Sequence, residues 1–591
     1  MLDARQGLTL EKDAHINSQD LVEYYMPPFQ SCARDSNVGA FMCSYNALNG
    51  VPTCADPWLL GDVLREHWGW TNEQQWVTSD CDAVQNIFLP HGYNDTREAA
   101  AAQALIAGTD VNCGTYYQNH LPAAYEQGLF DISVLDQALV RQYSSLVRLG
   151  YFDGLAVPYR NLTFADVNTP HAQQLARQAA VEGITLLKND GTLPMQITSN
   201  MTIALIGDWA NATSQMQGNY FGVPPYLHSP YYAATQTGAT VYLAGVPGGQ
   251  GDPTTDSWLP VWGYAEKADI IMYVGGVDDS VEEEGMDRNN IDWTGTQLDM
   301  IGQLAMYGKP MIVMQMGDQL DNTPIVSNPN ISALLWGGYP GQDGGVALFD
   351  IVQGIAAPAG RLPVTQYPAD YITQIPMTDM SLRPNATSGS PGRTYQWYTG
   401  DAVFEFGFGL HYTNFTASIS SSSPSSYGSS SNTTYSVSDL TSGCTETYMD
   451  RCAFQTFSVD VKNTGSVTSD YVALGFLAGQ HGPTPYPIKR LAAYQRLHDI
   501  TAGSTQTAAL NLTLGSLARV DDYGNTVLYP GDYALLIDTQ PLSFVNFTLT
   551  GDQVMLDKWP QPPTPRFQET DYFVGGYGGT YGEKLLINGT I

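Results

Sequence analysis

The hydrophobic pattern changes along the chain, and this change constrains the fold more than any other feature of the sequence. In residues 1–150 and 176–412, short apolar runs such as "VGAFMCSYN" and "DIIMYVGG" alternate with stretches of helical spacing. Such runs are typical of strands buried on both faces, and their alternation with helices predicts parallel sheets, either doubly wound or closed into a barrel. From residue 413 on, apolar and polar residues alternate, as in "FQTFSVDVKNTG", which predicts an all-β sandwich.

The pattern predicts a chain of several domains, in line with a length of 591 residues at roughly 100–200 residues per domain. Residues 1–150 are the first α/β unit, and 151–175 read as a linker. Residues 176–412 are the second α/β unit, 413–552 the β-sandwich, and 553–591 a Gly- and Pro-rich segment expected to be irregular. The Ser-rich stretch "SISSSSPSSYGSSSNTT" predicts a flexible surface loop within the sandwich.

The charge balance excludes some classes of partner. The chain has 58 acidic and 25 basic residues and a net charge of −33, which argues against nucleic acid or an anionic membrane surface. We expect no transmembrane helix, because no run approaches about 18 uninterrupted apolar residues. The chain contains no HExxH, GxSxG or paired CxxC motif, so nothing predicts a zinc site, a serine triad or thioredoxin-like chemistry. We therefore expect neither a metal nor a cofactor.

Frequent glycosylation sequons indicate a secreted glycoprotein. Seven cysteines also fit an oxidising compartment but leave one unpaired. The start, "MLDARQGLTLEKDAH", has no basic n-region and no apolar h-region, so we expect that N-terminal sequence is missing. The eleven sequon asparagines are Asn94, Asn161, Asn200, Asn211, Asn330, Asn385, Asn414, Asn432, Asn511, Asn546 and Asn588.

An aspartate ends one of the buried strands expected in the first unit. The stretch "QQWVTSDCDAV" reads as a strand that stops at Asp80 and is followed by a helix. Ligands of parallel α/β sheets bind at the carboxyl ends of strands, so Asp80 is a candidate nucleophile or base. The simpler alternative is that Ser79, Asp80 or Asp82 caps the following helix. The same rule places five side chains on the expected functional edge: Met42, Tyr45, Asp80, Asp110 and Asn112.

A second acidic cluster follows a strand of the second unit. Three consecutive carboxylates, Glu282, Glu283 and Glu284, precede Arg288 in "VEEEGMDR". Adjacent carboxylates raise one another's pKa, which suits a general acid that stays protonated near the working pH. The alternative is a solvated acidic loop. A calcium loop of the EF-hand type is excluded, because Val281 would occupy its third position.

Several long stretches match a known family. "VTSDCDAVQNIFLPHGY" resembles a nucleophile motif, and "QDLVEYYMPPFQSCARDSNVGAFMCSYNALNGVPTC" the segment before it. "WGGYPGQDGGVALFDIVQGIAAPAGRLPVTQYP" and "FEFGFGLHYT" match a second domain and its exit. Together these stretches resemble glycoside hydrolase family 3, and within it the fungal exo-1,4-β-xylosidase branch, from about Arg5 to Pro560. The resemblance implies an α/β multidomain fold: a partial (β/α)8 TIM-type barrel, an α/β sandwich and a fibronectin type III-like β-sandwich.

The resemblance also assigns roles to residues. It implies a retaining mechanism with Asp80, rather than Asp82, as the nucleophile. For the acid/base it favours Glu284, four residues before Arg288 in an "EGxDR" pattern, with Glu282 as runner-up. It places three residues, Met42, Tyr45 and Cys81, at the sugar subsite, where Cys81 replaces the usual Trp. In addition to these roles, we expect disulfides between Cys81 and Cys113 and between Cys444 and Cys452.

The resemblance begins part-way into the family's barrel domain. A (β/α)8 barrel takes about 200–250 residues, whereas about 150 precede the linker here, with three convincing strands. A Lys-His pair and other residues that grip the sugar belong to the upstream half, and the chain contains no Lys-His dipeptide. We therefore expect exposed sheet edges and apolar faces, poor solubility, and little or no activity of this polypeptide alone.

The implied function is removal of β-1,4-linked D-xylose from the non-reducing ends of xylo-oligosaccharides, in xylan degradation outside the cell. Close alternatives on the same fold are a β-glucosidase or an α-L-arabinofuranosidase. A different class of alternative is a non-catalytic carbohydrate-binding remnant, and a last one is a degraded product without function.

Overall fold

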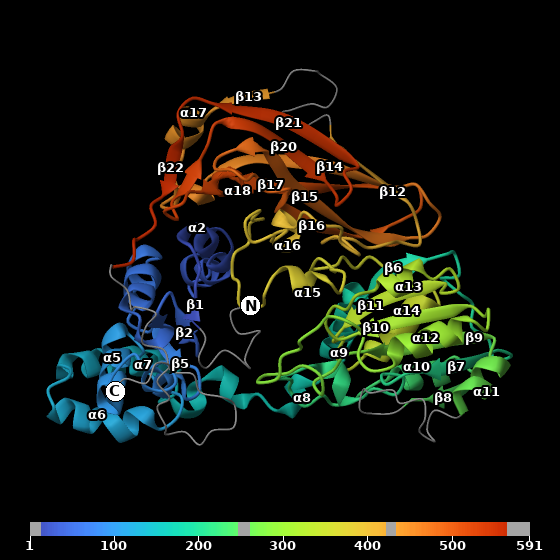
Figure 1. Cartoon of the computed structure of the whole chain (residues 1–591), viewed down its shortest axis with the longest axis horizontal. Helices are drawn as coiled ribbons and strands as arrows, with labels where there is room; N and C mark the ends of the chain where they lie inside the picture. Colours follow the sequence, from blue (N-terminus) through green and yellow to red (C-terminus); the bar gives the residue numbers. More distant parts are fainter. Residues whose placement is uncertain (1–12, 246–259, 421–432, 564–591) are drawn as a thin grey trace.

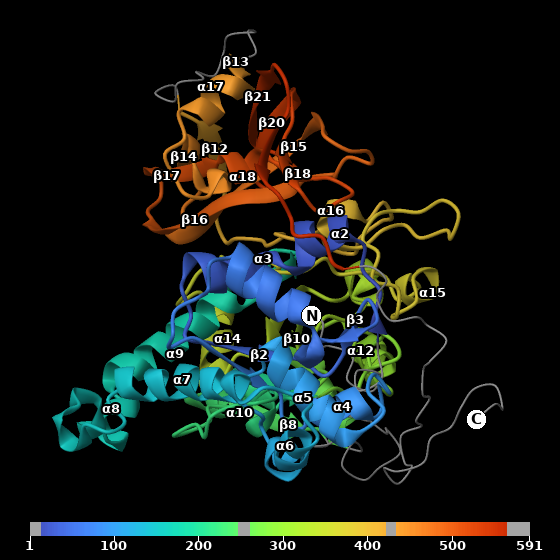
Figure 2. The same ribbon diagram turned by 90° about the vertical axis from the view of Figure 1, so that its left-hand side faces the viewer.

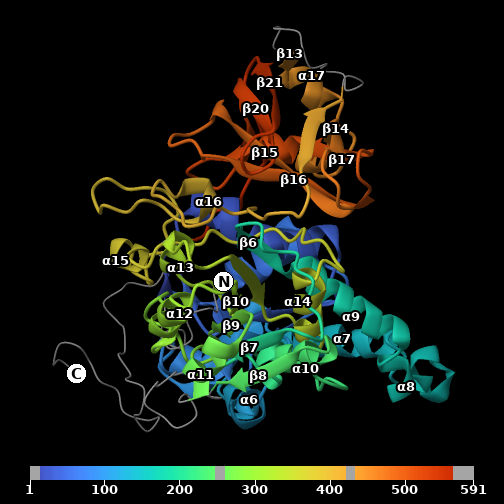
Figure 3. The same ribbon diagram turned by 90° about the vertical axis from the view of Figure 1, so that its right-hand side faces the viewer.

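A computed structural model describes residues 13–245, 260–420 and 433–563, which form three bodies (Figure 1). A first α/β body lies at the lower left, a second at the lower right, and a β-sandwich lies above both. The side views show that the sandwich rests on the other two bodies, and that the helices of the linker region extend away from it (Figures 2 and 3). Among the described residues, no helix combines the length and the apolar character that crossing a membrane requires.

The first body is built around a short parallel sheet. Strand β2 (Ala40–Cys43) pairs with β5 (Trp76–Ser79), and Met42 lies opposite Thr78. A third strand was expected at "TDVNC", but in the structure this segment contributes only an isolated bridge between Thr78 and Val111. The segment leaves the sheet after Val111, because the next two residues bond back to the hydroxyl of Ser79. In the described part of the chain this sheet is open and does not close into a barrel.

Helices flank this sheet, and several of them begin where the sequence provides a capping side chain. Asp56 Oδ1 accepts hydrogen bonds from the backbone N–H groups of Trp58 and Leu59, so the Asp-Pro signal starts a helix as expected. The Thr96 hydroxyl and the Asp131 carboxylate accept bonds in the same way further along. The helical elements are α2 (Ser18–Asp20), η1 (Leu21–Tyr25), α3 (Pro27–Gln30), η2 (Ser31–Asp35), η3 (Thr53–Ala55), η4 (Trp58–His67), α4 (Ala83–Phe88), α5 (Arg97–Ala107), α6 (Tyr116–Glu126) and α7 (Ile132–Arg148). A small second sheet contains β1 (Asp13–Ala14), β3 (Ala47–Leu48) and β4 (Val51–Pro52).

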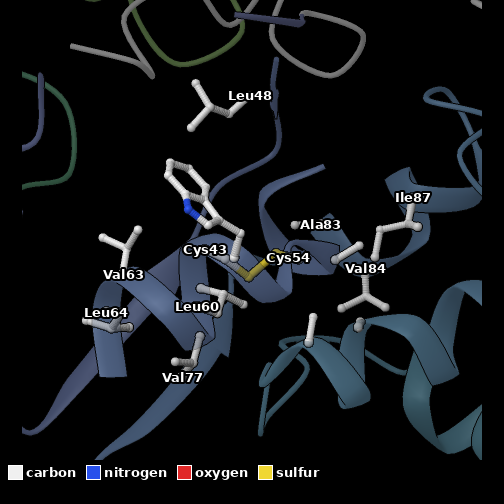
Figure 4. Close-up of a cluster of buried hydrophobic side chains, with 14 of the residues drawn as sticks. Cys43, Leu48, Cys54, Leu60, Val63, Leu64, Val77, Ala83, Val84 and Ile87 are labelled. Carbon is white, nitrogen blue, oxygen red and sulfur yellow. A yellow bond between two sulfur atoms is a disulfide. The ribbon is translucent and has the colours of Figure 1, made fainter. Parts of the chain in front are cut away.

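A disulfide that the sequence analysis did not anticipate lies in the core of the first body. Cys43, at the end of β2, is bonded to Cys54 in η3, and both are buried. Figure 4 shows this bond among the side chains of Leu60, Val77 and Val84, which come from η4, β5 and α4. The bond therefore ties the end of the central strand to the segment that leads into η4.

The outer surface of the first body is apolar in places. Of the 17 residues of α7, only Ala138 is buried. Leu139, Val140 and Tyr143 are exposed on the same helix, and Met42 is 54 % exposed on β2. These positions agree with the expectation of exposed apolar faces, and the poor solubility inferred from it stays a prediction.

The second body is a doubly wound sheet with helices on both faces. Its strand order is β6-β11-β10-β9-β7-β8, and all neighbours are parallel except β6, which runs antiparallel to β11 at one edge. Residues of β9 and β10 are buried throughout, as the unbroken apolar runs predict. The strands are β6 (Thr185–Asn189), β7 (Thr202–Ile206), β8 (Thr240–Ala244), β9 (Ile270–Gly276), β10 (Met311–Met316) and β11 (Ala333–Gly338). The helices are α9 (Pro170–Gly183), α10 (Pro230–Gln236), α11 (Pro260–Lys267), α12 (Gln297–Ala305), α13 (Thr323–Ser327) and α14 (Gly344–Val352), with η7 (Ser214–Gln217) between β7 and α10.

The segment expected to be a linker is mostly helical. It contains η5 (Gly154–Ala156), η6 (Pro158–Asn161) and α8 (Phe164–Val167), and α9 already begins at Pro170. Pro at the first turn and the Thr169 hydroxyl, which accepts a bond from the backbone N–H of Ala172, start α9 there. At the other end of the second body, α15 (Tyr371–Gln374) and α16 (Thr394–Trp397) lie in the long segment that leads to the sandwich.

The third body is the β-sandwich. Its two principal sheets have the orders β12-β14-β17 and β13-β21-β20-β15-β16, and they enclose one apolar core.

A third small sheet has the order β18-β19-β22. It shows that the expectation of an irregular segment from residue 553 is wrong for the first residues of that segment. Strand β22 (Val554–Asp557) pairs with β19, and Trp559 is buried against Trp58 of the first body. The described strands are β12 (Phe415–Ile419), β13 (Thr433–Ser436), β14 (Ala453–Asn463), β15 (Ser469–His481), β16 (Arg490–Ile500), β17 (Thr505–Thr513), β18 (Arg519–Val520), β19 (Thr526–Leu528), β20 (Gly531–Ile537) and β21 (Ser543–Thr550). The short helical elements are α17 (Val437–Ser442), η8 (Met449–Arg451) and α18 (Leu514–Leu517). Most of the Ser-rich stretch, and residues 564–591, lie outside the described residues.

A buried ionic junction holds the three bodies together. Asp20 and Glu23 of the first body both pair with Arg383, which belongs to the segment between α15 and α16. Glu23 also accepts a hydrogen bond from Arg519 of the sandwich at 2.7 Å. Both guanidinium groups lie over the ring of Trp397. Arg519 is only 1 % exposed, so its charge depends on Glu23 for compensation.

We expect the Glu23→Ala substitution to destabilise the assembly of the three bodies by about 3–5 kcal/mol, because it leaves the buried Arg519 without its carboxylate partner, while Arg383 keeps Asp20. The measurement is the melting temperature, followed by limited proteolysis at the domain junctions. Glu73→Ala, at an exposed glutamate of the first body, is the matched control. A melting temperature equal to that of the control would contradict this account of the junction.

Candidate active site

Asp80 lies immediately after β5, at the carboxyl end of the parallel strand pair. Its backbone N–H donates to the carbonyl oxygen of Cys43 at 2.9 Å, and its Oδ1 accepts from the N–H of Cys81 at 2.6 Å. Helix α4 starts after Asp82, whose backbone is left-handed with φ = 66°. Within the described residues no side chain caps α4 from that position, and the Ser79 hydroxyl accepts from the N–H of Cys113 instead. The capping alternative is therefore not what the structure shows for this turn.

Disulfides fix the segments around this strand end. Cys81 is bonded to Cys113, so the residue after Asp80 is tied to the segment that leaves the sheet at Val111. Cys444 is bonded to Cys452 in the sandwich, which is the other pairing expected from the sequence. With Cys43–Cys54 these bonds account for six cysteines, and Cys32 is an exposed free thiol.

Tyr45 connects the two acidic segments that the sequence singled out. It lies two residues after β2, and its backbone carbonyl accepts a hydrogen bond from His91 Nε2 at 2.8 Å. Burial raises the pKa of the Tyr45 hydroxyl well above its usual value. The charge of Asp80, a hydrogen bond to the Asp80 carboxylate, and the charge of Glu284 raise it further. The tertiary structure thus brings Tyr45 next to Asp80 of the first body and within the electrostatic reach of Glu284 of the second body.

The acidic loop follows β9, and its three glutamates have different surroundings. Glu282 is partly buried and forms an ion pair with Arg288, and the Tyr339 hydroxyl donates to its Oε1 at 3.5 Å. Burial raises the pKa of Glu282, while the Arg288 charge opposes that rise. Glu283 and Met286 exchange backbone hydrogen bonds of 3.1 and 2.9 Å, which turns the chain at Gly285. Glu284 lies at this turn with an exposed side chain.

A cavity of about 670 Å³ opens along this loop. Its wall combines carboxylates, amides, one guanidinium and a few apolar side chains, and so offers both donors and acceptors of hydrogen bonds. The lining residues are Asn219, Tyr220, Asp279, Glu282, Glu283, Glu284, Met286, Asp287, Arg288, Asn289, Asn290, Ile291, Asp318, Tyr339, Ile372 and Met377.

Some side chains expected at the functional edge lie elsewhere. Asp110 is buried and forms ion pairs of 2.9 Å with Arg65 and with Arg141, so it holds the first body together and does not face a ligand. Burial raises the pKa of Asp110, and the two arginines act against that rise. Met42 lines a separate apolar pocket with residues such as Phe29 and Phe41. Its role at a sugar subsite, like that of the exposed half-cystine Cys81, stays a prediction.

Three lining residues missed by the sequence analysis lie where parallel strands end. Asp279 follows β9, Asp318 follows β10, and Tyr339 follows β11. The rule that ligands bind at the carboxyl ends of parallel strands could have found them. Other residues of the wall come from loops without a sequence signal, among them the loop of Asn219 and Tyr220 and the segment of Ile372 and Met377.

Comparisons with known proteins agree with this architecture. The model of the glycosyl hydrolase family 3 N terminal domain matches residues 5–144, and that of the family 3 C-terminal domain matches residues 184–412. Relatives described as probable exo-1,4-beta-xylosidases from Aspergillus clavatus and Neosartorya fischeri are each 50 % identical to this chain, over 562 and 560 residues. In both cases the match covers 94 % of this chain and 71 % of the relative.

Solved structures extend this comparison. A family 3 exo-beta-xylosidase, XlnD, in complex with a xylobiose aziridine probe has a TM-score of 0.89 and 43 % identity, over 94 % of this chain and 71 % of that one. A beta-glucosidase from Listeria innocua shares the fold with a TM-score of 0.78 at 20 % identity. At half identity over nearly all of its length, the chain belongs to glycoside hydrolase family 3.

Proposed function

We propose that this protein is a retaining exo-β-xylosidase that removes xylose from the non-reducing ends of β-1,4-linked xylo-oligosaccharides. The observation that carries the proposal is the position of Tyr45, which hydrogen-bonds to Asp80 and lies within the electrostatic reach of Glu284. Retaining glycosidases need two carboxyl groups about 5–5.5 Å apart, one as nucleophile and one as acid/base. The relatives described as probable exo-1,4-beta-xylosidases support xylose as the sugar.

In this mechanism Asp80 attacks the anomeric carbon and forms a covalent glycosyl-enzyme. Glu284 protonates the leaving glycosidic oxygen, and it then takes a proton from the water that hydrolyses the intermediate. The hydrogen bond from Tyr45 orients the Asp80 carboxylate for attack and withdraws some of its charge. Because Tyr45 keeps its own proton over the working pH range, it acts as a donor throughout.

The position of Glu284 on the wall of the cavity, with an exposed side chain, supports this residue as the acid/base, because a glycosidic oxygen bound there could meet its carboxyl group. Glu282 is instead held by Arg288 and Tyr339, which suits a residue that fixes the shape of the loop. The raised pKa of Glu282 keeps that residue as the alternative acid. Substitution of each glutamate separates the two assignments, as described in the Discussion.

The test of the proposal is hydrolysis of xylobiose and of aryl β-xyloside by the purified protein, with aryl β-glucoside and aryl α-L-arabinofuranoside for comparison. Proton NMR of the first-formed product should show the β-anomer of xylose, as retention requires. A higher kcat/KM on the glucoside than on the xyloside would show that the enzyme removes glucose rather than xylose. Xylobiose binding without turnover, unchanged in Asp80→Ala, would establish a carbohydrate-binding protein instead.

We expect Tyr45→Phe to lower kcat about 10- to 100-fold, because a hydrogen bond to a charged group contributes about 1.5–3 kcal/mol. The measurement is kcat with aryl β-xyloside at saturating substrate, with the melting temperature recorded in parallel. An unchanged kcat would show that Tyr45 does not act on Asp80.

We further propose that the protein is a secreted glycoprotein. Eight of the sequon asparagines are exposed in the structure, and Asn94 is partly buried. Asn432 and Asn588 lie outside the described residues. The exposed ones are Asn161, Asn200, Asn211, Asn330, Asn385, Asn414, Asn511 and Asn546. Mass spectrometry of tryptic glycopeptides from culture medium tests both the location and the occupied positions.

A further inference from the structure

Strand β21 of the sandwich carries an exposed aromatic ring two residues before a glycosylation sequon. The stretch "FVNFT", residues 544–548, contains the sequon of Asn546. Side chains two residues apart on a strand point to the same face of the sheet, so Phe544, Asn546 and Thr548 share one face. Phe544 is 53 % exposed and Asn546 is exposed as well, whereas Phe547 on the other face is buried in the core of the sandwich. The strand therefore presents a ring beside an amide to which a sugar can be attached.

Small residues lie next to Asn546 across the sheet. Its partner on β20 is Ala534, and Ala534 pairs in turn with Ala478 of β15. Residues opposite each other on neighbouring strands point to the same face, so these three side chains form one row. Both alanines are partly exposed. On one side of the row the Thr548 hydroxyl donates to Asp532 Oδ1 at 2.9 Å. The short methyl groups leave room above the sheet for a sugar ring attached to Asn546.

The ring of Phe544 is the outer end of an apolar row across the same sheet. Phe544 pairs with Leu536 of β20, and Leu536 pairs with Phe476 of β15. Phe476 is fully buried and contacts the rings of Tyr395 and Phe406. Strand β21 runs along the top of the sandwich, away from the two α/β bodies (Figure 1). The row is thus covered at its inner end, whereas its outer end at Phe544 is open to solvent.

The sequon on β17 offers a comparison within the same body. Asn511 is also exposed on a strand, and Thr513 completes its sequon. Two residues before Asn511 lies Ala509 in place of an aromatic residue. The neighbour of Asn511 on β14 is Thr456, whose hydroxyl donates to Asn511 Oδ1 at 2.6 Å. Asn511 thus has a similar backbone setting without a ring at the position that Phe544 has on β21.

A sugar linked to Asn546 has the right chemistry and reach to cover the Phe544 ring. Residues two apart on a strand are separated by about 7 Å, a distance that a pyranose attached to the asparagine amide can span. The C–H face of a pyranose packs well against the negative face of an aromatic ring. Such packing removes apolar surface from water in the folded strand, and this favours the folded state.

We propose that Asn546 is an N-glycosylation site whose first N-acetylglucosamine packs on the ring of Phe544 and stabilises the sandwich. This inference rests on the proposal that the protein is a secreted glycoprotein. In the modification, Asn546 Nδ2 forms a bond to C1 of a lipid-linked oligosaccharide, displaces the lipid diphosphate and loses one proton. The sugar acts on the folded state and not on hydrolysis, because the cavity at the acidic loop is lined by residues of the second body.

The test is a double-mutant cycle on protein secreted from a eukaryotic host, with Phe544→Ala, Asn546→Gln and both together. We expect Asn546→Gln to lower the melting temperature of the sandwich by about 2–4 °C when Phe544 is present, and by less than about 1 °C in Phe544→Ala. Asn511→Gln removes a strand sequon without a neighbouring ring and is the matched control. It should lower the melting temperature by less than about 1 °C in both backgrounds. Equal losses for Asn546→Gln in both backgrounds, or no loss, would overturn the proposal.

Trimming of the glycan gives a second measurement that needs no substitution in the strand. An endoglycosidase that leaves only the first N-acetylglucosamine should keep the melting temperature of the parent within about 1 °C, because that sugar makes the contact. A trimmed protein that melts as low as Asn546→Gln refutes the contact. Glycopeptide mass spectrometry separates this inference from the proposed function. Glycans at other positions with Asn546 unoccupied overturn the inference alone, whereas absence of glycans from every sequon overturns both.

Discussion

Replacing Asp80 with Asn is expected to lower kcat for aryl β-xyloside by on the order of 10⁴-fold or more, because the covalent intermediate cannot form without the carboxylate. The side chain keeps its size, and its Oδ1 can still accept from the N–H of Cys81, so the protein should fold normally. The measurement is the rate with aryl β-xyloside at saturating substrate, with the melting temperature recorded in parallel.

Two controls identify Asp80 as the residue that forms the bond. Asp82→Asn changes a carboxylate two residues away, on the exposed turn before α4, and should reduce kcat only slightly. A 2-deoxy-2-fluoro-xyloside with a good leaving group should label the protein, and peptide mapping should place the xylosyl ester on Asp80. Labelling on Asp82, or a larger loss of activity in Asp82→Asn, would reverse the assignment.

Replacing Glu284 with Gln is expected to lower kcat/KM for xylobiose by about 10²- to 10⁴-fold, which is the usual contribution of a general acid. The loss should be much smaller for β-xylosyl fluoride, since fluoride departs without protonation. The basic limb of the pH profile, which reports deprotonation of the acid, should disappear in this variant. The two substrates and the pH profile together distinguish loss of the acid from a loss of folding.

Glu282→Gln is the comparison that decides between the two glutamates. Loss of its charge removes the ion pair with Arg288, so we expect similar losses on xylobiose and on the fluoride, through a less ordered loop. The basic limb of the pH profile should remain. If instead the leaving-group dependence and the missing basic limb appear in Glu282→Gln, then Glu282 is the acid/base and Glu284 has another role.

Much of the fold followed from local sequence. Strands β9 and β10 are contiguous apolar runs, and their burial on both faces follows from that composition alone. The helices η4 and α5 start at Asp56 and Thr96, because a capping side chain bonds to N–H groups only two or three residues away. Interactions of this range are visible in a short window of sequence.

The sequence did not show how distant segments meet. Asp110 looked like a residue of the functional edge, but Arg65 and Arg141 reach it from two helices and neutralise it in the interior. Strand β22 lies in a segment that looked irregular, since its partner β19 and the tryptophan contact with η4 are far away in sequence. The Cys43–Cys54 bond was missed for a related reason, because sequence alone does not determine the pairing of cysteines.

The sequence by itself determined the succession of α/β and β units, the strand end at Asp80 and the acidic loop after β9, because each depends on the order of neighbouring residues. Only the tertiary structure decided which of these groups share a site. It brought Tyr45 within the electrostatic reach of Asp80 and Glu284, paired Glu282 with Arg288, and lined one cavity with residues of the acidic loop and of other loops. The physical reason is that charge, burial and hydrogen bonding depend on atoms close in space, and the packing of the domains brings these atoms together.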